Sequence, residues 1–461
     1  MKNIVVFFSI LGLLTLFSCN NSGNKNLIKS IQSKDWTTSG EVNVKDTILI
    51  LDGAATSIFN KGNYKNFELS MELRTLSKGK GFIGIHTDPT EKGYRIIINN
   101  DREDPVWWRM TGSLFSVRNL TKSFVKDDEW FKMNIKVEGQ LITVRINDEL
   151  VVEYIEPSEP YRKGLNAKAL LSEGTFSVVS TGNGSIEFRK LVVQVPDESI
   201  DINIETLLAM SVDEQTDEII RLHQNDFPVL DYHVHLKGGL TKSEAAKQSR
   251  RVGINYAVAP NCGIGFPITS DEEIYAYLDT MRIQPFILAM QAEGREWVNT
   301  FSPEARNEFD YVFSDALTFN DHKGRRVHLW MNREVIIDDE QEYMDMIVDR
   351  TCSVLQEPFD IFVNPFFLPK ALSDRYDEFW TEERMNKVID VLAKSGKALE
   401  INELYQIPNK ALIMKAKNAG VKFTFGSNNV TPKVSKLEYS IRMIKECGLT
   451  QMDMYKPKIK I

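Results

Sequence analysis

Two patterns of hydrophobic and polar positions divide the chain. Between residues 35 and 195, short runs alternate apolar and polar residues with a period of two, as in Phe67, Leu69, Met71 and Leu73. Strands are predicted at residues 47–51, 67–73, 81–86, 94–98, 131–137, 141–146 and 186–193. Many short strands separated by Gly, Asn and Asp predict an all-β sandwich or jelly roll.

The pattern changes after residue 227, where strands and helices alternate. Strands are predicted at residues 229–235, 254–260, 285–292, 311–317, 360–365, 398–402 and 422–426, and helices at 243–252, 339–355, 382–394 and 409–418. About seven strands with crossover helices predict a parallel sheet that closes into a TIM-like α/β barrel over residues 227–461. Residues 196–226 are predicted as a linker, with a helix over 204–224.

The N-terminus has the pattern of a targeting segment. Lys2 precedes an apolar run from Ile4 to Phe17 that is short for a bilayer span, and the run ends at Ser18-Cys19. Residues 1–19 are therefore predicted as a lipoprotein signal peptide with Cys19 as lipid acceptor, and residues 20–34 as a polar tether. The protein is expected to be exported and lipid-anchored to a bacterial-type cell-envelope membrane. The alternative is an ordinary signal peptide followed by a chance cysteine.

The length, net charge and cysteine content of the chain exclude some classes of protein. A chain of 461 residues is too long for one ordinary core, so a multidomain protein is expected. The formal net charge is −8 and no long basic run occurs, which argues against nucleic acid as a partner. The 4 cysteines are few and widely spaced, so they do not form a disulfide framework.

The sharpest motif is the segment Asp231-Tyr-His233-Val-His235. Strand alternation predicts that Asp231, His233 and His235 share one face, with Leu230, Tyr232, Val234 and Leu236 on the other. Two imidazoles at this spacing can hold one divalent ion at the carboxyl end of a barrel strand, where active sites lie. The alternative is a pair of structural histidines.

Further polar residues follow the other predicted strands. They would converge at one barrel mouth, where polar groups are costly unless they bind something. Lys237 and Arg295 could hold an anionic or hydroxyl-rich substrate or a developing oxyanion. The remaining candidates are Gln291, Glu293, Asp315, Asn364, Glu400, Asn402 and Asn428. Each of them taken singly could also be a solvated loop residue.

The β region resembles a known family over residues 35–195. The resemblance rests on Tyr64-Lys-Asn-Phe67, Gly84-Ile-His86, Gly93-Tyr94, Thr111-Gly112, Glu129-Trp130 and Phe188-Arg189-Lys190. These segments are similar to the 3-keto-disaccharide hydrolase domain, a concanavalin-like jelly-roll sandwich. The family's acidic residue after Gly-Tyr is replaced by Arg95, which leaves glycan binding as an expected role.

The second region resembles the polymerase-and-histidinol-phosphatase (PHP) superfamily of metal hydrolases. The resemblance rests on Asp231-Tyr-His233-Val-His235, Glu293, Leu399-Glu-Ile-Asn402 and Phe423-Thr-Phe-Gly-Ser-Asn-Asn429. Three usual ligand positions carry Asn261-Cys262, Asn364 and Ser427-Asn428-Asn429 instead. The resemblance therefore implies one divalent ion, for which zinc, manganese or nickel are candidates, bound by His233, His235 and Glu293.

Together the two resemblances imply a hydrolase or lyase that acts on carbohydrate with metal assistance, with 3-keto-glycosides as candidate substrates. Glu400 or Asp315 would act as base, Lys237, Arg295, Asn402 and Asn428 would assist catalysis, and Gln291 and Asn364 would bind substrate. One alternative is a PHP-type phosphoesterase. The other is a non-catalytic glycan-binding lipoprotein that uses Trp107-Trp108 as its binding platform. The alternative for these two rings is packing in the sandwich core or between the domains.

Overall fold

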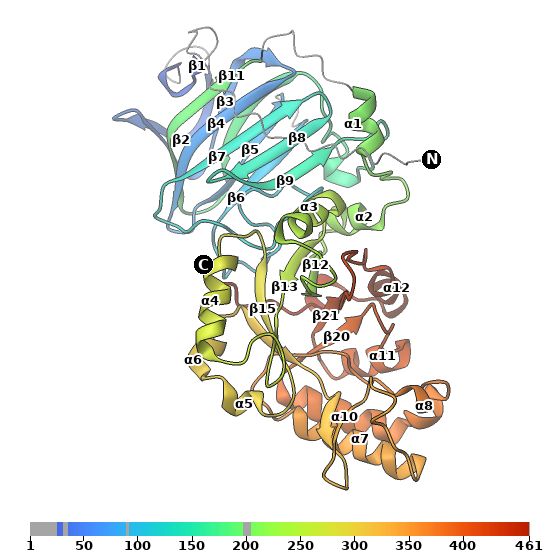
Figure 1. The fold of residues 1–461 in the computed structure, drawn as a ribbon. Helices are drawn as coiled ribbons and strands as arrows, with labels where there is room; N and C mark the ends of the chain where they lie inside the picture. The colour runs from blue at the N-terminus through green and yellow to red at the C-terminus, as the bar shows by residue number, and fades with distance from the viewer. Residues whose placement is uncertain (1–24, 31–35, 89–91, 197–203, 461) are drawn as a thin grey trace, which may run out of the picture.

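A computed structural model describes residues 25–30, 36–88, 92–196 and 204–460. It contains an antiparallel β domain followed by an α/β barrel, as the sequence predicts (Figure 1). None of the helices in these ranges is long and apolar enough to cross a membrane. Cys19 and the predicted signal peptide lie outside the described residues, so lipid anchoring stays a prediction.

The β domain is one continuous antiparallel sheet that folds over its own core. Its strands follow the order β6-β5-β10-β3-β11-β4-β7-β8-β9, with β2 added to β3 and β1 to β11. The two ends of this order meet, because the rings of Tyr94 on β6 and Tyr154 on β9 lie 6.1 Å apart. The strands span Lys25–Asn26 (β1), Trp36–Lys45 (β2), Ile48–Tyr64 (β3), Phe67–Leu76 (β4), Lys80–Thr87 (β5), Tyr94–Asn99 (β6), Phe131–Glu138 (β7), Leu141–Ile146 (β8), Glu149–Ile155 (β9), Gly174–Ser180 (β10) and Ser185–Gln194 (β11).

All seven strands predicted in this region are present, and β4 buries alternate residues from Phe67 onward as expected. Sequence reasoning missed β2, β9 and β10. The β2 segment has no apolar alternation because most of its side chains are exposed beside β3. The domain also begins earlier than predicted, since Lys25 pairs with Val193 and Leu27 is buried in the core. The tether is therefore shorter than residues 20–34.

The linker contains two short helices where one was predicted. Helix α1 spans Ile204–Met210 and α2 spans Glu218–Gln224, with Asp217 capping α2 through the amides of Ile219 and Ile220. The chain between the helices folds against the β domain, because Glu214 accepts hydrogen bonds from Tyr154 and from the amide of Tyr161. This tertiary contact interrupts a segment whose local pattern is helical.

The second domain is a closed parallel barrel. The strand order is β13-β12-β21-β20-β19-β16-β15, and β15 pairs with β13 to close the ring. All seven predicted strands are confirmed: Leu230–Val234 (β12), Asn255–Val258 (β13), Ile287–Ala292 (β15), Tyr311–Ser314 (β16), Ile361–Phe362 (β19), Ala398–Asn402 (β20) and Phe423–Gly426 (β21). A short strand β14, Asn261–Cys262, extends β13 along β15.

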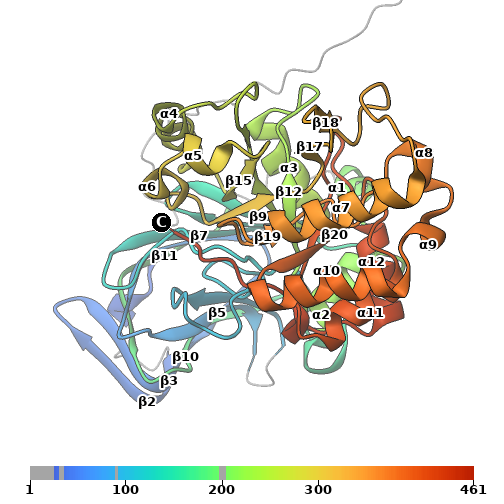
Figure 2. The same cartoon turned by 90° about the horizontal axis from the view of Figure 1, so that it is seen from below.

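Helices surround the barrel (Figure 2). Those predicted are α3 (Lys242–Val252), α7 (Glu340–Val354), α10 (Glu382–Ser395) and α11 (Lys410–Asn418), and they are confirmed within two residues at each end. Further helices are α4 (Asp271–Met281), α5 (Trp297–Thr300), α6 (Pro303–Arg306), α8 (Lys370–Ser373), α9 (Tyr376–Phe379) and α12 (Glu438–Cys447), and a hairpin joins β17 (Thr318–Asn320) to β18 (Arg326–His328).

The β domain closes the amino-terminal end of the barrel. Trp107 and Trp108 are buried in one cluster with Leu230, Ala257 and Ala398, which stand at or near strand starts. The Trp108 indole donates to Asp226 at 2.8 Å, and Lys122 donates to the Phe286 carbonyl at 2.6 Å. The two tryptophans are therefore interdomain packing, and the expectation that they form an exposed glycan platform is wrong. The mouth of the barrel faces away from the β domain (Figure 1).

Candidate active site at the barrel mouth

A β-bulge in β12 sets the geometry of the site. The pairing of β12 with β13 shifts register between Asp231 and Val234. Leu230 and Tyr232 both pack in the barrel interior, as alternation along a strand allows, and the extra residue brings His233 to the same side, against the Phe313 ring at 4.5 Å. The prediction that Leu230 and Tyr232 face the surrounding helices is therefore wrong, and strict alternation could not place His233 beside Tyr232.

His233 and His235 point their Nε2 atoms at each other. The two Nε2 atoms are 3.0 Å apart, and Gln291 Oε1 lies 3.4 Å from that of His233. His235 Nδ1 is 2.8 Å from the carbonyl oxygen of Ala259, which can only accept, so Nδ1 carries the proton. His233 Nδ1 is 2.6 Å from Glu400 Oε1 and donates to it in the same way. The Nδ1 atom of each ring is therefore a donor, and the two Nε2 atoms face each other.

Burial reinforces this arrangement. His233, His235 and Glu400 are all completely or nearly completely buried. Burial lowers the pKa of His235 well below its ordinary value, and the neighbouring His233 and Lys237 lower it further. The His235 ring therefore stays neutral at ordinary pH, and its Nε2 presents a lone pair to His233.

Glu400 and three asparagines hold His233 in place. Glu400 Oε2 accepts from the Asn364 amide at 2.7 Å and from Asn402 Nδ2 at 2.9 Å. Asn364 Oδ1 in turn accepts from Asn402 and from Asn428, at 3.0 and 2.9 Å. The network continues from Asn364 Nδ2 to Asp315 Oδ2 at 3.0 Å. Both oxygens of Glu400 are thus engaged in hydrogen bonds that position the His233 imidazole.

Glu293 lies in a separate part of the mouth. Its Oε1 accepts from Asn261, and its Oε2 has no hydrogen bond to any residue that the structure describes. Burial, together with the charge of Asp315, raises the pKa of Glu293 to about 8, against the effects of Asn261, Lys237 and Arg295. Lys237 stands at the exposed rim, where partial burial lowers its pKa.

Arg295 and Asp231 bind backbone groups that surround the site. The Arg295 guanidinium donates to the Asp315 carbonyl at 2.8 Å and pairs with Glu357 at 3.0 Å. Asp231 accepts from the amides of His233 and Ser427 at 3.1 and 3.0 Å and does not join the histidine pair. Burial raises the pKa of Asp231 to about 6. Both residues therefore shape the backbone at the mouth.

Glycine at position 426 leaves room for this network. A Cβ atom there would lie 2.0 Å from Glu400 Oε1 and 2.8 Å from His233 Cβ. The end of β21 must therefore carry glycine if Glu400 is to reach His233. Asn429, which sequence reasoning did not select, binds the His235 amide and carbonyl at 2.8 and 2.9 Å.

The donor set suits a two-histidine site rather than the predicted three-ligand site. Within residues 25–30, 36–88, 92–196 and 204–460, no group of three or more His, Cys, Asp or Glu could hold a metal ion. The structure does not bring Glu293 into the histidine pair. The three convergent acceptors are His233 Nε2, His235 Nε2 and Gln291 Oε1, and both outer imidazole nitrogens are bonded as in metal-ligating histidines.

Comparison with known proteins concerns the β domain. A comparison with curated proteins gives no match. A predicted glycosyl hydrolase from Parabacteroides distasonis ATCC 8503 is similar over 38% of this chain and 94% of its own, at 16% identity and a TM-score of 0.34. The carbohydrate-binding module CBM66 from Bacillus subtilis is similar over 35% and 95%, at 13% identity and a TM-score of 0.27. Residues 24–194 match the model of the 3-keto-alpha-glucoside-1,2-lyase-like domain, a carbohydrate-related family.

Proposed function

We propose that this protein is a carbohydrate-active enzyme whose barrel mouth cleaves glycosidic bonds with the help of one divalent metal ion. The family match over residues 24–194 supports a carbohydrate as substrate. The observation that carries the site is the 3.0 Å approach of His233 Nε2 and His235 Nε2, whose outer nitrogens are both bonded as in metal-ligating histidines. His233, His235 and Gln291 would hold the ion.

A bound divalent ion would supply Lewis-acid polarisation of a substrate carbonyl oxygen. With a 3-keto-glycoside, ionised Glu293 would accept the proton from the carbon beside the ketone through its unbonded Oε2, and the raised pKa makes this carboxylate a stronger base that is mostly ionised only above about pH 8. The electron pair of that C–H bond forms the new C=C bond, and the glycosidic oxygen leaves with the electrons of its own bond and takes a proton from solvent. Lys237 lies at the rim near Glu293, where its ammonium group would orient this departing oxygen.

The structure favours the barrel over the β domain as the place of chemistry. The loop that carries Trp107 and Trp108 closes the opposite end of the barrel from the histidine pair. A glycan bound on the β domain would therefore not reach His233. The β domain serves as the base of the barrel in this proposal.

The test is metal content by mass spectrometry beside turnover of a 3-keto-glycoside panel. The variants are His233→Asn and His235→Asn, since asparagine reproduces the Nδ1 donor of each ring and removes Nε2. We expect about one ion per wild-type chain and its loss, with turnover, in both variants. His322→Asn, an exposed histidine, is the matched control. Full metal content or full turnover in the variants would refute the proposal.

A non-catalytic glycan-binding role is the second candidate, because the described part of the chain offers only two histidines and an amide as donors. It predicts saturable sugar binding without turnover or bound metal. A PHP-type phosphoesterase would release phosphate from phosphate esters in the same panel, and the asparagines at positions 364 and 428 give it fewer metal ligands. Export and lipid attachment at Cys19 are part of the proposal and are tested by mass spectrometry of the mature N-terminus.

A further inference from the structure

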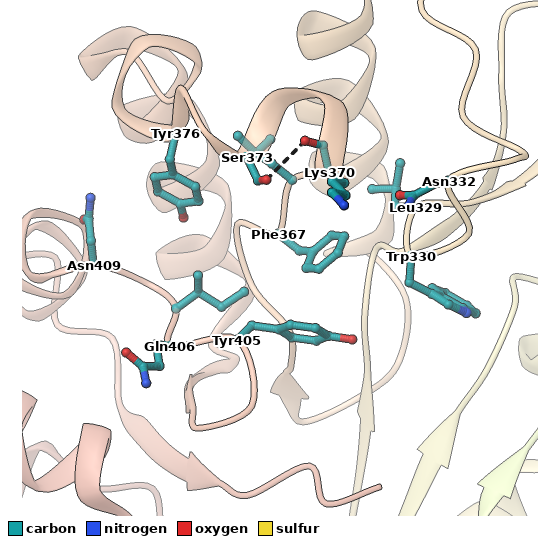
Figure 3. Close-up of a pocket in the computed structure, with 12 residues that line it drawn as sticks. Leu329, Trp330, Asn332, Phe367, Lys370, Ser373, Tyr376, Tyr405, Gln406 and Asn409 are labelled. Carbon is teal, nitrogen blue, oxygen red and sulfur yellow. Dashed lines mark hydrogen bonds between the residues drawn. The ribbon is translucent and has the colours of Figure 1, made fainter.

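A cavity of about 670 Å³ lies in the loops at the barrel mouth (Figure 3). Its walls come from the segments that follow β18, β19 and β20, and they include Trp330, Phe367, Lys370, Tyr376 and Tyr405. The volume is in the range of cavities that hold small molecules. None of these residues belongs to the histidine network described above.

The cavity begins where the histidine network ends. The amide of Tyr405 donates to Asn402 Oδ1 at 2.9 Å, and Asn402 binds Glu400. Burial, followed by the negative charges of Asp315 and Glu400, raises the pKa of the Tyr405 hydroxyl. The Tyr405 side chain therefore lines the cavity next to the carboxylates of the mouth.

Two aromatic rings present open faces to this space. Trp330 and Tyr405 are 36% and 37% exposed, which is high for side chains of this size. Each ring is fixed by a neighbour, since Phe367 contacts Tyr405 edge-on at 4.8 Å and His328 contacts Trp330 at 4.9 Å. In Figure 3 both rings border the cavity. Rigid, exposed aromatic faces suit a flat apolar ligand face at low entropic cost.

Four polar side chains of the cavity lack partners within the described chain. The Tyr376 hydroxyl is buried and has no hydrogen bond within the described chain. The side chains of Asn332, Lys370 and Gln406 likewise have no hydrogen bond or ion pair with the residues that the structure describes, yet all three line the cavity. A buried hydroxyl without a partner costs free energy that a ligand hydroxyl would recover.

We infer that this cavity binds a second pyranose ring of the substrate, placing its glycosidic bond at the histidine pair. A pyranose has an apolar face for Trp330 or Tyr405 and hydroxyl groups at its edge for Tyr376 and Gln406. Lys370 is the one charged side chain among the described lining residues, which is too little for a phosphate-rich ligand. This inference takes the class of substrate, a carbohydrate, from the proposed function. It adds that the substrate is a disaccharide.

The test is isothermal titration of the full chain with maltose, cellobiose, trehalose, sucrose and lactose, beside methyl α-glucoside and 4-nitrophenyl α-glucoside. We expect one disaccharide to bind at least tenfold more tightly than either monosaccharide derivative. Trp330→Ala should weaken that binding about tenfold and Tyr376→Phe should weaken it several-fold. Tyr275→Ala, an exposed aromatic residue on α4, should leave it unchanged.

The inference would be overturned if the wild type bound no disaccharide, or if Trp330→Ala left the binding unchanged. It would also be overturned if the nitrophenyl glucoside bound most tightly, because the cavity would then hold an aromatic aglycone. Thermal melting checks that Trp330→Ala is folded, and Trp330→Leu replaces it if it is not. Metal content separates the two proposals. Loss of metal in His235→Asn is a property of the histidine site alone, whereas Trp330→Ala should keep its metal.

Discussion

The protein contains two buried polar clusters of opposite character. In the β domain, Arg162 pairs with Glu214 at 2.7 Å and donates to the hydroxyls of Tyr94 and Tyr154 at 2.5 and 2.6 Å. Every strong donor there meets an acceptor. At the barrel mouth, His235 Nε2 and Gln291 Oε1 both approach His233 Nε2, at 3.0 and 3.4 Å.

This difference separates a structural cluster from a binding site. The β-domain cluster is complete with its own residues, because Glu214 from the linker neutralises the guanidinium and seals it from solvent. In the function proposed above, a cation or a substrate completes the mouth cluster. Burial by itself therefore does not mark the functional site, whereas the match of donors to acceptors does.

The largest expected effect comes from breaking the complete cluster. Glu214→Gln leaves the Arg162 charge buried, with Glu156 at 4.0 Å as the remaining carboxylate. We expect a loss of about 3–5 kcal/mol in the free energy of unfolding, measured by urea denaturation. The control is Asp338→Asn, which breaks the exposed pair with Lys323 and should cost less than about 1 kcal/mol. Equal effects in the two variants would contradict the comparison.

Gly426→Ala tests the space that the mouth cluster needs. The added Cβ would lie 2.0 Å from Glu400 Oε1, so Glu400 must leave His233. We expect about 3 kcal/mol of destabilisation, at the upper end for overpacking of a core. Metal content should fall as well, since His233 loses the partner that orients it. A variant with wild-type stability and wild-type metal content would show that the Glu400 side chain can adopt another conformation without loss of either.

His223 is an intermediate case, with one nitrogen bonded to the Gly253 carbonyl at 2.8 Å and the other unpaired. Burial and the nearby Arg118 lower the pKa of His223 to about 3, from 6.5. The unfolded chain therefore binds more protons between these values, and stability falls as pH falls below 6.5. At pH 5 this loss is about 2 kcal/mol.

The measurement is urea unfolding of wild type and His223→Gln at pH 7.5 and pH 5. Glutamine keeps a donor for Gly253 and cannot titrate, so the variant should lose about 2 kcal/mol less between the two pH values. His86, whose pKa burial lowers to about 4, adds a loss of similar size over this range, and it does so equally in both proteins. Parallel pH profiles would show that His223 is not buried as the structure places it.

The smallest expected change in stability is at the histidine pair itself. His235→Asn keeps a donor for the Ala259 carbonyl and removes one of the two facing lone pairs. We expect the unfolding free energy of the metal-free protein to change by less than about 1 kcal/mol. Chelated wild type is the matched reference. A loss as large as that of Glu214→Gln would mean that the histidine pair is a structural cluster.

Much of the fold follows from the sequence alone. The period-two pattern of segments such as 67–73 and the alternation of strands and helices after residue 227 predict the two domains and all seven barrel strands, because these patterns reflect which face of each element is buried. Strand parity also placed Gln291, Glu293, Glu400 and Asn402 on the inner face. The exposed β2 segment carries no such pattern, and the sequence therefore did not reveal it.

Only the tertiary structure decided how the site residues are connected. The bulge in β12 brought His233 to the same side as Tyr232, and the β domain buried Trp107 and Trp108 at the end of the barrel opposite the mouth. Glu293 binds Asn261 rather than the histidine pair, and Tyr405 and Trp330 line one cavity although their loops are far apart in sequence. Local pattern fixes which way a side chain points along its own strand. Which groups then meet depends on strand register and loop paths, which are set by packing over the whole molecule.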